Sequence, residues 1–258
     1  MKFKLAIVGH GFVGKAVDYG FTHPNVDKTI IDPNYNNSIR DIPADVQLIF
    51  ICVPTPFGSF DIFREVMSEL SKYGFFGNSI VAIKSTVTPD VLSEFKTTGV
   101  IYNPEFLTEK HANEDFINPP MHIFGGNGHN IELLESYYNS YSLCSPAPVF
   151  RVTIEEASMI KYTINSFLAT KVTFFNEIYH ACQDKGFDFN KIINAVSADP
   201  RIGRSHTKVP GFDGKLGFGG ACFPKDTRAL QHQAGMRNVD TSVLNAVIAK
   251  NNQLRMKK

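Results

Sequence analysis

The sequence predicts an α/β fold class: a doubly wound parallel sheet in the first part of the chain, followed by an all-α domain. The first part alternates short apolar runs of the buried-strand type with helical patterns, which is typical of a parallel sheet between helices. The second part repeats its apolar residues at helical spacing only. We place the boundary near Thr153, which gives domains over residues 1–152 and 153–258.

Composition excludes several classes of function. The chain has 258 residues, of which 43% are hydrophobic and 20% charged, so it can bury one large core or two smaller ones. Its net charge of +1 gives no electrostatic basis for binding nucleic acid or an anionic membrane. No apolar run approaches the roughly 18 residues of a membrane span, and the first residues run directly into a strand pattern. We therefore expect no leader and no membrane segment.

The cysteines favour a reducing compartment. All four lie far apart in the sequence, and none forms a CxxC pair. This spacing argues against a disulfide framework or a zinc site. We expect a cytoplasmic protein without a metal.

The first strand pattern, residues 4–8, leads directly into the glycine motif Gly9-His-Gly-Phe-Val-Gly14, and a helical pattern follows. A strand, this motif and a helix together predict a Rossmann domain that binds a dinucleotide. Gly9 permits the tight turn, Gly11 lets backbone N–H groups reach a pyrophosphate, and Gly14 lets the helix pack on the strand. The N-terminus of the helix also favours phosphate groups. The residues expected at the cofactor here are Gly9, Gly11, Phe12, Val13 and Gly14.

The second strand pattern, residues 28–31, ends at Asp32, 18 residues after Gly14. A carboxylate at this position is placed to bind the 2′-hydroxyl of the adenosine ribose and to repel a 2′-phosphate, so NAD is favoured over NADP. Arg40 leaves NADP as the alternative. The strand, motif, helix, second strand and acid together favour an NAD-binding domain over an isolated glycine turn.

Further strand patterns lie at residues 46–53, 79–84, 100–102, 122–124 and 149–152, with helical patterns at 62–73, 89–96 and 130–140. In a doubly wound sheet the carboxyl ends of the strands face the ligand crevice. Polar side chains follow three of these strands, and we expect them near the cofactor or substrate: Thr55, Ser85, Thr86 and Glu105. Taken singly, each hydroxyl is equally well explained as a helix cap or a turn.

The all-α part begins with Thr153-Ile-Glu-Glu156, which matches a capping box and predicts a long helix that ends near Gly186. Lys161 and Asn165 lie four residues apart on this helix and therefore point from one face. A solvated lysine is the alternative. Further helical patterns cover residues 188–196, 227–233 and 242–255.

A glycine-rich stretch precedes the last cysteine. Gly217, Gly219 and Gly220 lead into Cys222, which indicates backbone that bends sharply or approaches a ligand closely. A helical pattern resumes after Pro224, so we expect Cys222 near a helix N-terminus, where the thiolate is favoured. Taken alone, a buried and inert cysteine is the simpler interpretation.

Six stretches resemble the UDP-glucose/GDP-mannose dehydrogenase family in their order and approximate spacing. Together they span most of the chain, and the last is highly specific. They are Gly9-His-Gly-Phe-Val-Gly14, Lys84-Ser-Thr-Val87, Asn103-Pro-Glu-Phe-Leu107, Ile160-Lys-Tyr-Thr-Ile-Asn-Ser-Phe-Leu168, Asp199-Pro-Arg-Ile-Gly203 and Gly217-Phe-Gly-Gly-Ala-Cys-Phe-Pro-Lys-Asp226.

The resemblance implies a four-electron oxidation of a nucleotide sugar, in which two NAD molecules take a primary alcohol through an aldehyde to a carboxylate. It implies that the thiolate of Cys222, a strong nucleophile, attacks the aldehyde. The thiohemiacetal is then oxidised to a thioester, and water releases the acid.

The resemblance also assigns catalytic roles to the other residues. Lys161 and Asn165 would stabilise oxyanion character on the reacting oxygen. Asp226 would hold Lys161 and the hydrolytic water. Thr86 and Glu105 would order water and move protons.

Binding residues and partners follow from the same resemblance. Those implied along the substrate are Phe106, Leu107, Gly219 and Lys225, with Arg201 reaching the substrate of a neighbouring subunit. Those implied at NAD, besides the glycine motif, are Asp32, Thr55, Ser85 and Glu109. We expect a homodimer through the all-α part, because the long helix and the last helix have apolar faces that a small domain can hardly cover. Family members carry a third, C-terminal domain for the nucleotide, so we expect a separate polypeptide to supply it or nucleotide sugars to bind weakly.

Two alternatives remain open. β-Hydroxyacid dehydrogenases also join a Rossmann domain to a helical domain with a lysine and an asparagine on one helix, but their two-electron reaction needs no thiol, and Cys222 argues against them. The other alternative is a regulatory subunit that binds NAD without turnover, and the full set of candidate catalytic residues argues against it.

Overall fold

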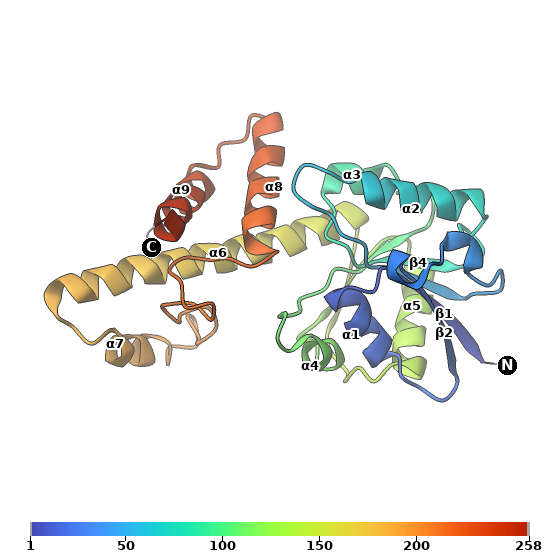
Figure 1. The fold of residues 1–258 in the computed structure, drawn as a ribbon, viewed down its shortest axis with the longest axis horizontal. Coiled ribbons are helices and arrows are strands. Elements are labelled where there is room, and N and C mark those ends of the chain that lie inside the picture. Colours follow the sequence, from blue (N-terminus) through green and yellow to red (C-terminus); the bar gives the residue numbers. More distant parts are fainter. Residues whose placement is uncertain (1, 257–258) are drawn as a thin grey trace. The chain divides into compact units, whose positions relative to one another are not determined.

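The computed structural model describes residues 2–256 of the protein (Figure 1). The chain divides into two compact units, Met1–Lys161 and Tyr162–Lys258, and the division falls inside the long helix α6, Ile154–Lys185. The predicted boundary at Thr153 lies at the start of this helix instead. Among the described residues, no helix is both long and apolar enough to cross a membrane.

Unit 1, over its described residues, is built on a seven-stranded sheet with the order β2-β1-β3-β4-β5-β6-β7. The strands are β1, Phe3–Val8; β2, Val26–Ile31; β3, Leu48–Ile51; β4, Ile80–Ile83; β5, Ile101–Tyr102; β6, His122–Gly125; and β7, Val149–Val152. The first five are parallel, as predicted, and the strand order reverses between β1 and β3. In such a sheet the ligand crevice lies at this reversal, beyond the carboxyl ends of the strands.

The last two strands depart from the predicted parallel sheet. β6 pairs antiparallel with β5, where Tyr102 lies opposite Gly125, and β7 pairs parallel with β6. The alternation of strand and helix patterns does not encode strand direction. The connection between β5 and β6 contains only the short helix α4, Ala112–Ile117, which the sequence pattern did not predict.

Helices cover both faces of this sheet (Figure 1). One face packs against α2, α3 and the first turn of α6, and the other against α1, α4 and α5. Neighbouring residues of β1 point to opposite faces, so that Ala6 and Val8 join the first core cluster and Leu5 and Ile7 the second. The helices not yet bounded are α1, Phe12–Gly20; α2, Asp61–Lys72; α3, Pro89–Ser93; and α5, Gly128–Tyr141.

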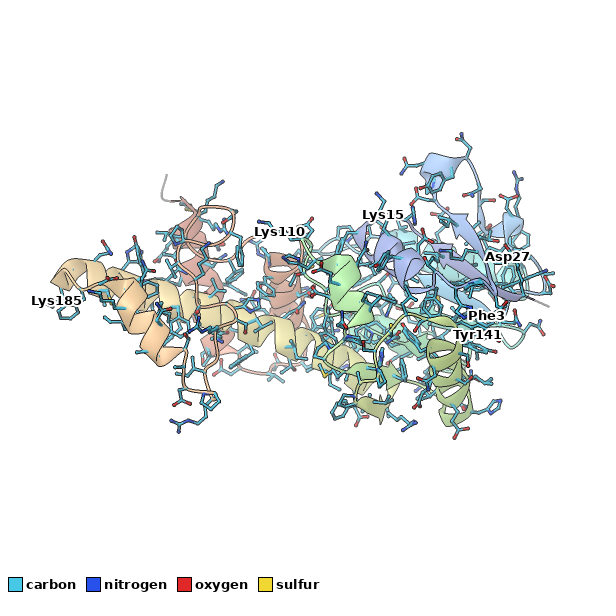
Figure 2. The ribbon with its side chains drawn as sticks, turned by 90° about the horizontal axis from the view of Figure 1, so that it is seen from below. Phe3, Lys15, Asp27, Lys110, Tyr141 and Lys185 are labelled. Carbon is cyan, nitrogen blue, oxygen red and sulfur yellow. The ribbon has the colours of Figure 1, made fainter. Side chains whose placement is uncertain are left out.

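Short features complete unit 1. Two 3₁₀ helices, η1 over Pro33–Tyr35 and η2 over Ile39–Asp41, follow β2. At the start of β1, the Phe3 ring stacks on Tyr141 at the end of α5, with ring centroids 4.2 Å apart (Figure 2).

Helix α6 starts with the predicted capping box. The Thr153 N–H donates to Glu156 Oε2 at 2.8 Å, and the Glu156 N–H donates to Thr153 Oγ1 at 3.2 Å. These bonds satisfy two of the N–H groups that a helix N-terminus leaves without partners.

The described part of unit 2 has helices as its only regular elements, as predicted. Besides the rest of α6 they are α7, Phe189–Val196; α8, Phe223–Met236; and α9, Ser242–Met256. Helix α8 begins earlier than the predicted Thr227, because Pro224 is compatible with the first turn of a helix. One core cluster of the unit joins Ala169 of α6, Phe218 and Val247 of α9.

Candidate active site

The glycine turn between β1 and α1 has the steric properties expected of a dinucleotide site. Gly9 has a φ of +92°, and a Cβ there would lie 2.6 Å from a carbonyl oxygen at the end of β3. A Cβ on Gly14 would lie 2.0 Å from the Gly9 carbonyl oxygen. A Cβ on Gly11 would meet no described atom within 4 Å, so open space adjoins the N-terminus of α1, which Phe12 and Val13 begin. A pyrophosphate fits such a position.

Asp32 follows β2, and its carboxylate bonds to the glycine turn. Oδ2 accepts from the backbone N–H of His10 at 2.7 Å, and Oδ1 accepts from that of Asn34 at 3.0 Å. These hydrogen bonds, the one from His10 foremost, lower the pKa of Asp32. Each oxygen retains capacity for a ribose hydroxyl, so the arrangement fits NAD. Arg40, which left NADP as an alternative cofactor, is exposed, and its Nε lies 3.8 Å from Asp41 Oδ1.

Hydroxyl groups after β3 and β4 tie the two strand ends together. Thr55 Oγ1 donates to the Thr86 carbonyl oxygen at 2.8 Å, and Ser85 Oγ donates to the Val53 carbonyl oxygen at 2.8 Å. Thr86 is buried as a residue, and its hydroxyl has no hydrogen bond to any described residue, so it is available to a ligand or water. Glu109 is exposed in the segment after β5.

Lys161 and Glu105 form a buried ion pair in unit 1. Their side chains are 3% and 5% exposed, and Lys161 Nζ lies 3.1 Å from Glu105 Oε1. Nζ also donates to the Glu105 carbonyl oxygen, and Glu105 Oε2 accepts from the Leu107 N–H at 2.7 Å. The ring of Phe106 lies 5.2 Å from Nζ. The alternative of a solvated lysine is therefore wrong, and Lys161 is held by Glu105 and Phe106, two consecutive residues after β5.

Asp226 is fully buried in unit 2 and is held by two donors. Asn165 Nδ2 donates to Oδ2 at 2.6 Å, and Lys225 Nζ donates to Oδ1 at 2.6 Å. Within unit 1 the counter-charge of Lys161 is Glu105, since a buried ammonium requires one, and the expected contact of Asp226 with Lys161 stays a prediction. Within unit 2, Asp226 holds Asn165 and Lys225.

Cys222 occupies the N-cap position of α8, as predicted. Asp226 lies one turn further, and its N–H donates to the Cys222 carbonyl oxygen at 2.8 Å. Cys222 is half-buried as a residue, as is Cys144, whereas Cys52 and Cys182 are buried. A nucleophile at a helix N-terminus, with a buried carboxylate one turn along, is an arrangement suited to covalent catalysis.

Arg201 lies in the turn after α7 and is exposed. Its guanidinium binds the neighbouring Asp199, with Nη2 2.6 Å from Oδ2. Within unit 2 it therefore reaches no other candidate site residue by a described hydrogen bond.

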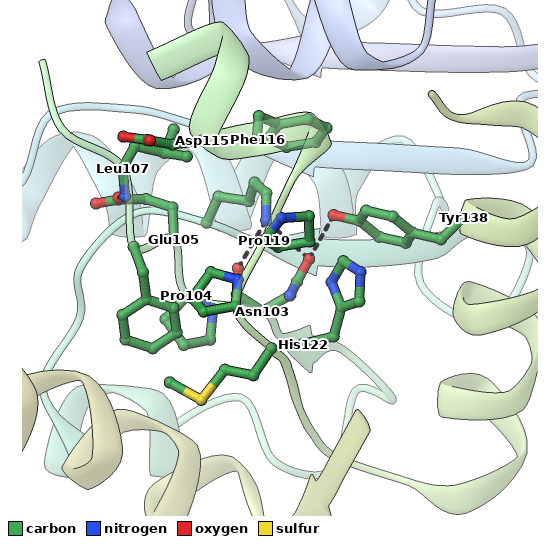
Figure 3. A pocket seen from close by; sticks show the side chains of 13 residues that line it. Asn103, Pro104, Glu105, Leu107, Asp115, Phe116, Pro119, His122 and Tyr138 are labelled. Carbon is green, nitrogen blue, oxygen red and sulfur yellow. Dashed lines mark hydrogen bonds between the residues drawn. The ribbon is translucent and has the colours of Figure 1, made fainter. Parts of the chain in front are cut away.

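Sequence reasoning gave no role to a buried lysine beside Glu105. A cavity of about 30 Å³ in unit 1 is lined by Lys84, whose Nζ donates to the carbonyl oxygen and Oδ1 of Asn103 at 3.1 and 2.8 Å (Figure 3). The Tyr138 hydroxyl donates to the same Oδ1 at 2.7 Å. Burial lowers the pKa of Lys84 to about 8. Lys84 thus fixes the turn that carries Glu105. The sequence feature that could have indicated this role is a lysine at the end of an otherwise apolar strand.

Reasoning from the sequence also missed three side chains that hold the glycine stretch before Cys222: Asn176, Asn251 and Arg255. They come from α6 and α9, and their spacing in the sequence gave no signal of this contact.

Comparison with known proteins gives matches to both units. Residues 34–142 match the NAD binding domain of the UDP-glucose/GDP-mannose dehydrogenase family, and residues 155–253 match its central domain. UDP-glucose 6-dehydrogenase TuaD of Bacillus subtilis is 32% identical over 250 residues, which cover 90% of this chain and 52% of that protein. The chain spans about half the length of the curated relatives it matches.

Solved structures agree on the fold. A UDP-glucose dehydrogenase from the archaeon Pyrobaculum islandicum has a TM-score of 0.83 at 25% identity, over 98% of this chain and 68% of that one. A 3-hydroxyisobutyrate dehydrogenase from Mycobacterium tuberculosis has a TM-score of 0.77 at 13% identity, over 100% of this chain and 95% of that one. At that identity the second likeness shows the fold alone. Since two different domains of one family match in succession along the sequence, this chain belongs to the UDP-glucose/GDP-mannose dehydrogenase family.

Proposed function

We propose that this chain is an NAD-dependent nucleotide-sugar 6-dehydrogenase of the UDP-glucose type, which oxidises a primary alcohol to a carboxylate in two steps. The observation that carries the proposal is Cys222 at the N-cap of α8, one turn before the buried Asp226. A two-electron dehydrogenase has no use for a thiol in this position. The cysteines of this chain form no disulfide in the described structure, which favours the reducing conditions of the cytoplasm.

The residues that would hold the cofactor are the glycine turn, with its open side at Gly11, and Asp32 at the ribose. Ser85, Thr55 and Glu109 are further candidates for contact with NAD. When bound, NAD supplies the acceptor for one hydride in each of the two oxidations.

The chain's own residues would move protons and stabilise charge. Lys161 would donate to the reacting oxygen when that oxygen carries negative charge, and Glu105 would hold the lysine for this task. Asn165 has a second amide hydrogen beyond the one it gives to Asp226, and this hydrogen would serve the same oxygen. The Thr86 hydroxyl, which has no partner among the described residues, would order water.

Cys222 would carry the second oxidation. The thiolate forms a C–S bond to the aldehyde carbon, and the carbonyl oxygen takes up a proton to give a thiohemiacetal. Loss of a hydride and of that proton leaves a thioester. Water then attacks the thioester carbon, the C–S bond breaks, and the thiolate leaves as the carboxylate forms. Asp226 would keep Asn165 and Lys225 in place throughout.

Substrate binding and assembly complete the proposal. Phe106, Leu107, Gly219 and Lys225 would lie along the nucleotide sugar. We propose a homodimer through unit 2, because Phe167 and Phe174 are exposed seven residues apart on one face of α6. The exposed Arg201 would then reach the substrate of the partner copy. Because the chain spans about half the length of its relatives, contacts to the nucleotide would also come from a third domain or a separate polypeptide.

The amount of NADH formed per sugar tests the proposal. The chain is incubated with excess NAD and a limiting amount of each nucleotide sugar in a panel that includes UDP-glucose and GDP-mannose. Two NADH per sugar and a carboxylate product are expected. One NADH and an aldehyde product would support the two-electron alternative, and NAD binding without NADH formation would support a regulatory subunit.

Removal of the thiol gives a second test. Cys222→Ser should abolish steady-state acid formation, because serine at neutral pH is a far weaker nucleophile than thiolate. Cys144→Ser, which changes a cysteine of unit 1, is the matched control and should retain activity. Acid formation at the parent rate in Cys222→Ser would contradict the mechanism.

A further inference from the structure

The loop that precedes Cys222 is held by side chains of two helices. Asn176 of α6 accepts from the Gly217 N–H at 3.0 Å. Asn251 of α9 accepts from the Phe218 N–H at 2.7 Å and donates to the Phe218 carbonyl oxygen at 3.1 Å. Arg255 of α9 donates to the carbonyl oxygens of Phe218 and Gly217 at 3.0 and 3.1 Å. Every backbone N–H and C=O of these two loop residues is therefore bound by a side chain.

These three residues, Asn176, Asn251 and Arg255, are called the loop clamp below. The two asparagines are 1% and 6% exposed. An amide buried so deeply loses its hydrogen bonds to water on folding, so its bonds to the loop are costly to break.

Gly217 is adapted to this arrangement. Its φ is +72°, and a Cβ there would lie 2.4 Å from Asn251 Oδ1 and 3.2 Å from Leu254 Cβ. A side chain at this position would displace the amide of Asn251. The glycine and the asparagine therefore form a matched pair across the loop.

Cys222 depends on this loop because only three residues separate it from Phe218. Two of them are Gly219 and Gly220, which have no side chains that packing could fix. The Phe218 side chain is buried, and its ring lies 6.3 Å from that of Phe223 in the first turn of α8. The short glycine segment is thus fixed at one end by the loop clamp and at the other by α8.

We propose that Asn251, with Asn176 and Arg255, is a positioning residue for the Cys222 thiol. The amide of Asn251 fixes the backbone of Phe218, and the glycine segment transmits that position to the cysteine. This inference rests on the proposed function of Cys222 as the nucleophile. Arg255 also forms an ion pair with Asp213, so a change there disturbs a second loop, and Asn251 is the cleaner residue to test.

The two oxidations respond differently to a displaced thiol. The first turns an alcohol into an aldehyde, with loss of a hydride and a hydroxyl proton, and involves no thiol. The second requires the bond between Cys222 and the aldehyde carbon. A displacement of about 1 Å in a reacting group can slow a step by on the order of 100-fold. Loss of the clamp should therefore slow the second oxidation and spare the first.

The test compares Asn251→Ala with Asn252→Ala. Asn252 is the neighbouring residue of α9, of the same type, and its side chain has no hydrogen bond to any described residue. NADH formation is followed after rapid mixing of the full chain, excess NAD and limiting UDP-glucose. In Asn251→Ala the first NADH should form within about threefold of the parent rate and the second about 10- to 100-fold more slowly. Asn252→Ala should match the parent in both phases.

Hydrogen exchange gives a readout that needs no activity. The amides of Gly217 and Phe218 should be protected in the parent chain and in Asn252→Ala, and should exchange faster in Asn251→Ala. Asn176→Ser, which loses a single bond to the loop, provides a second variant if Asn251→Ala does not fold, and it should slow the same phase by a smaller factor. Equal slowing of both phases, or loss of amide protection with an unchanged second phase, would overturn the proposal. A parent chain that forms fewer than two NADH per sugar would instead count against the proposed function, and hydrogen exchange would still test the clamp.

Discussion

Removal of the Glu105 carboxylate should destabilise unit 1 far more than removal of an exposed glutamate of the same unit. Glu105→Ala leaves the Lys161 ammonium, whose side chain is 3% exposed, with one carbonyl acceptor and no counter-charge. It also removes the acceptor of the Leu107 N–H. Loss of one partner from a buried ion pair typically costs about 3–5 kcal/mol. Because the carbonyl bond to Lys161 survives, we expect a loss of about 3 kcal/mol.

Glu94→Ala is the matched control. Glu94 pairs with Arg64 through two hydrogen bonds, at 3.0 and 2.6 Å, but the two side chains are 44% and 43% exposed. An exposed pair of this kind contributes about 0.2–1 kcal/mol. The same substitution at two ion-paired glutamates therefore isolates the effect of burial.

Urea unfolding followed by circular dichroism measures both losses, since the chain has no Trp to report by fluorescence. Both substitutions lie in unit 1 and are read from the same transition. Glu105→Gln, which keeps an acceptor for Leu107 and Lys161 but not the charge, should fall between the parent and Glu105→Ala. Losses that agree within about 0.5 kcal/mol for Glu105→Ala and Glu94→Ala would refute the reasoning, because burial would then have no energetic consequence.

Four further substitutions have expected outcomes. Burial lowers the pKa of Lys84 from 10.5 to about 8, so between these pH values the unfolded chain binds a proton that the folded chain does not. The free energy of unfolding should therefore rise with pH over that window. Urea unfolding of Lys84→Met should lack on the order of 3 kcal/mol of this rise. Gly14→Ala, whose new Cβ would lie 2.0 Å from a backbone oxygen, should lower the melting temperature markedly. In Gly11→Ala the new Cβ meets no described atom within 4 Å, so this variant should melt within about 2 °C of the parent. It should bind NAD more weakly in a titration, and an affinity equal to that of the parent would exclude Gly11 from the cofactor site. Asp32→Asn should bind NAD roughly 10-fold more weakly than the parent. The ratio of its affinities for NAD and NADP should also fall, because the variant lacks the charge that repels a 2′-phosphate. An unchanged ratio would contradict the role of Asp32.

The parts of the fold predicted correctly are those that neighbouring residues specify. The helix after Gly9 and the capping box at Thr153 depend on contacts within a few residues, and the strand before Gly9 is marked by its own run of apolar residues. The position of Cys222 at the start of a helix was predictable for the same reason, from the glycines before it and Pro224 after it.

The parts that were missed depend on contacts between distant segments. Lys161 and Glu105 were both singled out, but they lie 56 residues apart, and their pairing could not be deduced from spacing. Asn251 lies 33 residues from Phe218, and in the sequence it is only a polar residue within an amphipathic helix. Strand direction is also set by tertiary packing, which is why the reversal of β6 and β7 was not predicted.

The first turns of α6 fix the position of Lys161 relative to the sheet. β7 runs opposite to β5, and α6 follows it directly, so that Ala157 packs on Gly125, which lies opposite Tyr102 at the carboxyl end of β5. About one turn further along the helix, Lys161 reaches Glu105. The number of residues between Ile154 and Lys161 thus fixes both the position of the lysine along the helix axis and the direction of its side chain. One residue inserted there would turn Lys161 by about 100° and raise it by about 1.5 Å. We therefore expect this first stretch of α6 to tolerate substitution of its outward-facing residues but no change of length.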